Sequence, residues 1–171
     1  PTVCLSNYAH SSGTKAWLIE SEGNDHLWAD AKTIFDPCPV GYKVPSAAVF
    51  KTFSTSGVYT VDPSDFDVAD VSGDGIINAD DFAYGWNFNL KDKSLLFPAA
   101  ARYDGSYAML MGSKSGLWGT YWANSAATGT TTYKGMADVA LTFMVEGKNI
   151  ATSAAAYSNK ADAYSVRCVK Q

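Results

Sequence analysis

The 171-residue chain lacks the features of several common protein classes. It has no basic stripe and a formal net charge of −4 at pH 7, which argues against nucleic acid or an anionic membrane surface as a partner. No apolar run approaches the roughly 18 residues of a membrane-spanning helix. The chain begins at Pro1 without a methionine or a signal peptide, so we expect a mature or excised domain.

Catalytic signatures are also scarce. The two histidines are isolated in polar stretches, and the chain contains no nucleophile elbow, phosphate-binding loop or dinucleotide fingerprint. Asp62, Asp65, Asp67 and Asp70 are clustered and could supply an acid and a base, but their setting beside proline and serine is typical of an exposed loop. We therefore expect a protein that is not an enzyme. A glycan-active enzyme using the carboxylates of residues 62–81 is an alternative.

There are three cysteines, and none of them forms a C-x-x-C pair, so zinc and thioredoxin-like chemistry have little support. An odd count allows one disulfide and one further thiol. Cys38 and Cys168 each lie in a stiff apolar frame near one end of the expected fold, so we expect these two to be bonded. The alternative is three reduced thiols that pack as small hydrophobic residues.

The amino-acid composition is that of a folded domain. Hydrophobic residues make up 47% of the chain and aromatic residues 13%, values that exclude a disordered chain. The length suits one core, and neither an internal repeat nor a long linker divides it. We expect a single domain over residues 1–171.

Apolar spacing predicts one clear helix and several short strands. The helix covers residues 47–53, with Ser46 as its N-cap and with Val49, Phe50 and Phe53 on one face. Alternation of apolar residues from 139 to 145 predicts a strand with one buried face. Shorter extended stretches are expected at residues 1–7 and 42–44 and at the C-terminus. This order favours an α+β fold over an alternating βαβ fold.

The strongest chemical motif is an acidic loop over residues 70–81. Gly75 occupies the sixth position of a twelve-residue calcium loop, where the chain must turn sharply, and Ile77 would anchor the loop to the core. Oxygen ligands at this spacing suit Ca²⁺ better than Mg²⁺, so we expect a structural calcium ion. The alternative is a solvated acidic turn. The six ligand positions are occupied by Asp70, Ser72, Asp74, Ile76 (through its carbonyl), Asn78 and Asp81.

This loop resembles the calcium repeat of dockerins. It is present once, whereas dockerins and EF-hands pair theirs, so cohesin binding is not implied. Its last position is Asp81 rather than glutamate, and bidentate binding there would need a closer approach of the chain to the ion.

Two segments of the last third, residues 101–122 and 144–162, keep no regular period. They mix small residues with tyrosine, tryptophan, methionine and polar groups, a composition that suits an adaptable binding surface. Trp122 is expected in the core and Trp118 on the surface. The residues that we expect to contact a ligand are Tyr103, Asp104, Tyr107, Met109, Lys114, Trp118, Thr120, Met144, Glu146, Lys148, Asn149, Tyr157 and Asn159.

Five spaced motifs carry a resemblance to a known family. They are Lys-Thr-Ile-Phe-Asp-Pro-Cys-Pro-Val-Gly-Tyr-Lys-Val-Pro at 32–45, Gly-Trp-Asn-Phe at 85–88, Leu-Phe-Pro-Ala-Ala at 96–100, Gly-Thr-Tyr-Trp-Ala-Asn at 119–124 and Ser-Val-Arg-Cys-Val-Lys at 165–170. In this order they resemble the FISUMP domain (Fibrobacter succinogenes major paralogous domain), over most of the chain from Lys32 onward. The acidic loop would be an insertion into that domain.

The resemblance implies a C-type-lectin-like mixed fold with short strands, one clear helix and long loops. Its termini would lie close together, which would bring Cys38 and Cys168 into the same region. Some members resemble variable proteins of diversity-generating retroelements, in which the variable positions precede an ending like residues 160–169. The sugar-binding tripeptides Glu-Pro-Asn and Gln-Pro-Asp are absent, so sugar binding through calcium is not expected.

The function implied by this resemblance is ligand binding outside the cell. We expect a non-catalytic adhesin or receptor domain on the outer surface of a Gram-negative bacterium, diversified and carried at a pilus tip. Its partner would be a protein or glycan on another cell or a host surface. The alternative is a structural pilus or surface subunit whose exposed aromatic residues contact neighbouring pilus subunits.

Overall fold

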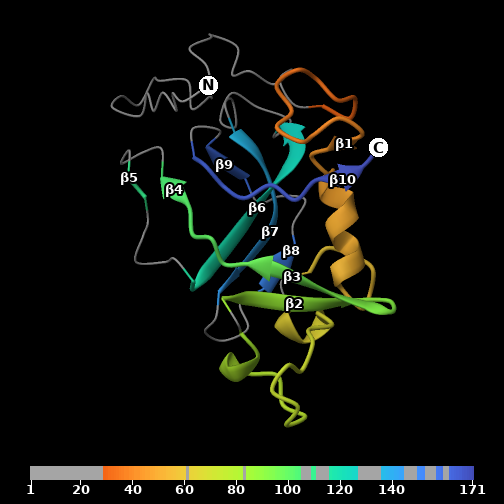
Figure 1. Ribbon diagram of the computed structural model, residues 1–171, viewed down its shortest axis with the longest axis vertical. Coiled ribbons are helices and arrows are strands. Elements are labelled where there is room, and N and C mark those ends of the chain that lie inside the picture. The colour runs from red at the N-terminus through yellow and green to blue at the C-terminus, as the bar shows by residue number, and fades with distance from the viewer. Residues whose placement is uncertain are drawn as a thin grey trace.

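The computed structural model of the chain describes residues 29–60, 62–82, 84–104, 109–110, 116–126, 136–144, 150–152, 157–159 and 162–171. In this part of the chain the fold is a mixed one of short antiparallel strands with one longer helix and a disulfide (Figure 1). None of the described helices has the length and apolar character needed to cross a membrane.

The described elements are short. The helical ones are 3₁₀ helices: η1 (Ala47–Phe53), η2 (Pro63–Asp65) and η3 (Ala79–Asp81). The strands are β1 (Tyr42–Lys43), β2 (Gly85–Leu90), β3 (Lys93–Pro98), β4 (Tyr103–Asp104), β5 (Met109–Leu110), β6 (Trp118–Ala126), β7 (Met136–Met144), β8 (Ile150–Thr152), β9 (Tyr157–Asn159) and β10 (Val169–Lys170).

The strands form four antiparallel groups. Strand β7 is the centre of the largest group, because it pairs with β6, β8 and β9. The other groups are the pairs β1–β10, β2–β3 and β4–β5. The hairpin β2–β3 crosses below β6 and β7 in Figure 1. Helix η1 lies beside the hairpin and also beside β6 and β7.

Helix η1 has the residue bounds that the sequence predicts, but it is a 3₁₀ helix and its predicted face is partly wrong. With three residues per turn, Phe50 and Phe53 lie on the same side and their rings stack at 5.4 Å between centroids. Val49 lies on another side and is 37% exposed. Ser46 has extended backbone at the N-cap position, but among the described atoms its hydroxyl makes no capping bond.

The hydrophobic core is an aromatic cluster built around Phe97 of β3. Its ring lies 5.0 Å from that of Phe53, 5.6 Å from that of Phe88 and 5.1 Å from that of Tyr121, between ring centroids. All these contacts are edge-to-face, the arrangement that the ring quadrupoles favour. The core therefore joins η1, the β2–β3 hairpin and β6 into one packed unit.

A disulfide and a strand pair join the two ends of the described chain. Cys38 is bonded to Cys168, with 5.7 Å between their Cα atoms, so the predicted pairing is confirmed. Beside it β1 pairs with β10, and the N–H of Gln171 donates to the carbonyl of Gly41. A disulfide is consistent with a location outside the reducing cytoplasm.

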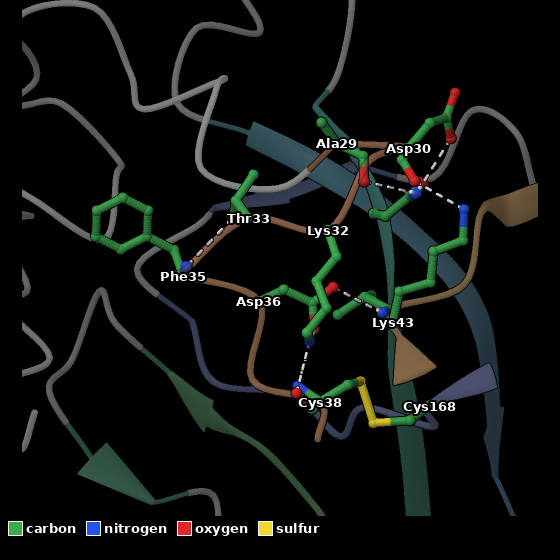
Figure 2. A network of polar contacts seen from close by, with 11 residues as sticks. Ala29, Asp30, Lys32, Thr33, Phe35, Asp36, Cys38, Lys43 and Cys168 are labelled. Atoms are coloured by element: carbon green, nitrogen blue, oxygen red, sulfur yellow. Dashed lines mark hydrogen bonds and ion pairs between the residues drawn. A yellow bond between two sulfur atoms is a disulfide. The ribbon is translucent and has the colours of Figure 1, made fainter. Parts of the chain in front are cut away.

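The loop before β1 is held by the carboxylate of Asp36 (Figure 2). It accepts hydrogen bonds from the Lys32 ammonium at 2.9 Å, the Cys38 N–H at 2.8 Å and the Val44 N–H at 3.0 Å. Burial opposes ionisation of this carboxyl, but the Val44, Lys32 and Cys38 donors together outweigh burial and lower the pKa of Asp36. The network thus fixes the chain on both sides of Cys38.

Candidate functional site

Backbone pairing brings parts of the two predicted binding segments side by side. Trp118 of β6 lies directly opposite Met144 of β7. Tyr103 and Ala163 form an isolated antiparallel bridge, and the N–H of Ala101 donates to the carbonyl of Trp118 at 2.9 Å. The segment 101–103 therefore lies between the start of β6 and the stretch that follows residue 162.

An arginine that the sequence did not single out lies behind Trp118. The guanidinium of Arg102 is 5.9 Å from the ring centroids of both Trp118 and Tyr164, within the range of a cation–π contact. It also donates to the Tyr164 hydroxyl at 3.3 Å, and that hydroxyl donates to the carboxylate of Asp162 at 3.1 Å. Arg102 and Tyr164 thus tie the first binding segment to the end of the second. A lone arginine in an irregular stretch gives no sequence signal for such a role.

The two tryptophans of β6 differ as the sequence predicts. Trp122 is buried and stacks on Tyr164 with 4.4 Å between ring centroids, so its core role is confirmed. Trp118 is partly exposed. An aromatic side chain with one open side can supply contact area to a ligand at low entropy cost.

Thr120 does not fit the predicted binding surface. It is only 7% exposed, and on one side its backbone is flanked by the chain around Ser165, whose N–H donates to the Thr120 carbonyl at 3.0 Å. On its other side Thr120 is paired with Thr142 of β7. We therefore remove Thr120 from the candidate ligand contacts.

The register of β7 separates the remaining candidates into two groups. Tyr157 and Asn159 of β9 pair with Asp138 and Met136, at the end of β7 opposite to Met144. At about 3.3 Å per residue, this places them roughly 20 to 26 Å along β7 from the Trp118–Met144 pair. The predicted residues therefore do not form one compact patch around Trp118.

The structure says less about the other predicted ligand contacts. Asp104 pairs with Met109 across β4 and β5. The predicted contacts Tyr107, Lys114, Glu146, Lys148 and Asn149 lie outside the described residues.

In the acidic loop the carboxylate of Asp70 turns toward the loop's own backbone. It accepts hydrogen bonds from the N–H groups of Gly73 at 2.6 Å and Gly75 at 2.7 Å. Gly75 has a φ of +80°, a conformation that favours glycine, as the sixth position of a calcium loop requires. Ile77 packs against the core as predicted.

Asp81 closes the same loop at its other end. Its carboxylate accepts hydrogen bonds from the N–H groups of Ser72, Asn78 and Val71 at 2.8 to 2.9 Å. These donors, those of Ser72 and Asn78 first, lower the pKa of Asp81. The carboxylate is thus kept ionised and oriented inward.

The other predicted calcium ligands are arranged less favourably. The Asn78 amide donates to the Ile76 carbonyl at 3.2 Å, so a cation bound by that carbonyl would have to compete with this contact. Among the described residues, Asp74 accepts a local bond from the Ile76 N–H at 2.7 Å. Within the described residues there is no group of three or more acidic, histidine or cysteine side chains placed to hold a metal. The carboxylates of Asp70 and Asp81 also accept bonds from the loop backbone, so a bound cation would have to share or displace these contacts too.

The clustered aspartates before the loop are also bonded locally. Asp65 accepts bonds from the hydroxyls of Ser56 and Thr55, both at 2.6 Å, and these donors lower its pKa. The hydroxyl and N–H of Ser64 likewise lower the pKa of Asp62. A general acid needs a raised pKa, so these two carboxyls are poorly suited to the acid role of a glycan-active enzyme.

Comparisons of the chain with protein-family models, with curated proteins and with solved structures gave no match, so the family resemblance stays a prediction from the motifs.

Proposed function

We propose that this chain is a non-catalytic, extracellular ligand-binding domain of the FISUMP type with a C-type-lectin-like fold. It would act as an adhesin or receptor on the outer surface of a Gram-negative bacterium, at a pilus tip, and bind a protein or glycan on another cell or a host surface. The observation that carries the proposal is the pairing of Trp118 with Met144 and of Tyr103 with Ala163. These pairs bring the aromatic-rich segment 101–122 and the ends of the small and polar segment 144–162 together on one framework.

The chemistry of this region suits ligand contact. Tyr103 and Trp118 are partly exposed, and Arg102 behind Trp118 restricts its ring through the cation–π contact. A pre-oriented aromatic ring binds with a smaller loss of side-chain entropy than a mobile one. Variation of the neighbouring residues would then change specificity, while the framework of β6 and β7 stays the same.

The proposal is tested first by sequencing this locus across a population of the source cells. We expect substitutions to concentrate in residues 101–119 and 144–162, while the motifs around Cys38 and Cys168 stay fixed. Variation scattered evenly over the chain would contradict a diversified binding surface.

A second test measures adhesion of the labelled chain to candidate target cells. Trp118→Ala should reduce binding about tenfold, the size of a single interface hot spot. Tyr42→Ala is the matched control, because Tyr42 is an exposed aromatic residue in β1, beside the disulfide. Equal binding by both variants would contradict the assignment of Trp118.

A structural pilus or surface subunit is the second candidate, and the surface near the disulfide favours it. Ile34 is 93% exposed and Val40 is 94% exposed, and both lie in the loop before β1. Exposed apolar residues of this kind are typical of contacts between subunits. Concentration-dependent polymerisation that Ile34→Asp and Val40→Asp abolish would support this alternative over the first.

We also propose that the acidic loop binds a structural Ca²⁺ ion. The register of oxygen ligands and the left-handed conformation of Gly75 at the sixth position support it. The ion would stabilise the loop and take no part in contact with the ligand, because the loop lies beyond β2, away from β6 and β7 in Figure 1.

A further inference from the structure

Tyr84 has an unusual combination of backbone conformation and exposure. Its φ of 58° lies in the left-handed region, which a bulky aromatic residue seldom adopts, and its side chain is 80% exposed. The backbone is held there because the Tyr84 carbonyl accepts a hydrogen bond from the Ala99 N–H at 2.6 Å. An exposed ring at a strained position adds little to the core, and such strain is typical of functional sites.

The ring of Tyr84 lies over Gly116, just before β6. A Cβ atom at Gly116 would come within 3.2 Å of the Tyr84 ring, and Gly116 itself has a φ of +76°. The Gly116 N–H donates to the Ala99 carbonyl at 2.8 Å, so this loop and Tyr84 are bonded to the same residue. Leu117 follows and is 43% exposed. Tyr84, Gly116 beneath its ring and the exposed Leu117 that follows in the chain are called here the Tyr84 patch.

A strongly acidic stretch leads into the Tyr84 patch along the chain. Residues 62–82 contain seven aspartates and no lysine, arginine or histidine. Among the exposed aspartates, Asp80 of η3 is the nearest to Tyr84 in the sequence and precedes it by four residues. Aspartate carboxyls are ordinarily ionised at neutral pH, and no basic side chain of this stretch offsets their charge. The negative field beside the patch is therefore fixed by the loop itself.

We propose that the Tyr84 patch is a docking site for a protein segment that presents an apolar side chain next to lysine or arginine. The apolar side chain would pack on Tyr84 and Leu117, and the basic group would face the aspartates. A second copy of the chain fits less well, because a symmetric contact would place two acidic stretches against each other. This site adjoins the proposed ligand surface, because Leu117 directly precedes Trp118, but Tyr84 and the acidic stretch lie outside that surface.

The test is an NMR titration of the ¹⁵N-labelled full chain with two short synthetic peptides. One peptide alternates leucine with lysine, and the other alternates leucine with glutamate. We expect the lysine peptide to shift the amide signals of Tyr84, Gly116 and Leu117, and to do so less at ~500 mM salt than at ~50 mM because charge is screened. Equal shifts with both peptides, or shifts confined to other regions, would overturn the proposal.

Tyr84→Asn is the decisive variant, because asparagine tolerates the left-handed conformation and leaves the backbone unchanged. We expect an unchanged or higher melting temperature together with a loss of about tenfold in affinity for the lysine peptide. Trp118→Ala should leave that affinity unchanged, which separates this site from the proposed ligand surface. Full affinity in Tyr84→Asn, or self-association of the free chain that this variant abolishes, would rule out the proposed occupant.

Discussion

Tyr103 and Ala163 exchange two backbone hydrogen bonds, at 3.0 and 2.9 Å, although 60 positions separate them in the chain. Ala163 is exposed, so its side chain can be changed without disturbing the core. Ala163→Pro removes the N–H that donates to Tyr103, and we expect a loss of about 1–3 kcal/mol in the free energy of unfolding. Urea denaturation measures it. Ala163→Ser is the control, and equal stability of the two variants would contradict a structural role for this bridge.

A second prediction concerns the acid stability of the loop that precedes β1. The pKa of Asp36 is lowered in the folded chain, so its contribution to stability is present above its ordinary pKa of 3.8 and is lost as the pH falls through the lower folded value. Asp36→Asn should lower stability at pH 7 by about 1–3 kcal/mol, since one N–H or ammonium donor then faces an amide nitrogen. It should also flatten the fall in stability below about pH 4.

Thermal unfolding between pH 2 and pH 7 checks this prediction. Asp92→Asn is the matched control, because Asp92 is an exposed aspartate in the turn between β2 and β3. If the two variants lose stability with acid in parallel, Asp36 does not hold the disulfide loop as its contacts indicate.

The sequence predicted local elements better than it predicted their partners. The bounds of η1 and the strand β7 follow from apolar spacing within a few residues, which is local information. The hairpin β2–β3 was not predicted, although Trp86 and Phe88 alternate with polar residues. Its turn residue Lys91 adopts a φ of 58° without the glycine or asparagine that usually marks such turns.

The candidate site was harder to predict, because it depends on pairings distant in sequence. The contact of the Ser165 stretch with Thr120 and the separation of Tyr157 from Met144 both follow from register, which composition does not encode. Tyr84 gave no signal, since its importance rests on a backbone angle and an exposed ring. The disulfide was predictable because three cysteines allow few pairings.

A third prediction tests calcium binding by the acidic loop. At a free Ca²⁺ concentration ten times Kd, binding should add about 1.4 kcal/mol to the free energy of unfolding, and a chelator should remove that gain. Asp74→Asn should weaken binding without changing the stability of the metal-free chain, because Asp74 is exposed and accepts a local bond from the nearby Ile76 N–H. Calorimetric titration measures the affinity, with Asp92→Asn as the control.

Asp81→Asn is less informative, since it also removes a hydrogen-bond acceptor from the loop backbone. If the melting temperature is the same with calcium and with a chelator, the loop does not bind calcium and is an acidic turn held by its own hydrogen bonds. In that case the backbone bonds to Asp70 and Asp81 are sufficient to account for its conformation.

The last prediction concerns Tyr121, whose buried ring is part of the core. Burial raises its pKa to about 12, and its hydroxyl donates to the Pro98 carbonyl at 2.8 Å. Because the folded pKa lies above the ordinary value of 10, the stabilising contribution is complete below pH 10 and is lost as the pH rises toward 12. Tyr121→Phe should cost about 1 kcal/mol at pH 7 by leaving that carbonyl without its donor.

The same variant should lose stability less steeply as the pH rises, because it lacks the hydroxyl whose pKa differs between the folded and unfolded states. Denaturation series at pH 7 and between pH 9 and pH 12 measure both effects. Tyr42→Phe is the control, since Tyr42 is an exposed tyrosine. If Tyr121→Phe and Tyr42→Phe show the same alkaline slope, the hydroxyl of Tyr121 is not held in the interior by Pro98, and the contact between β3 and β6 is weaker than the core packing indicates.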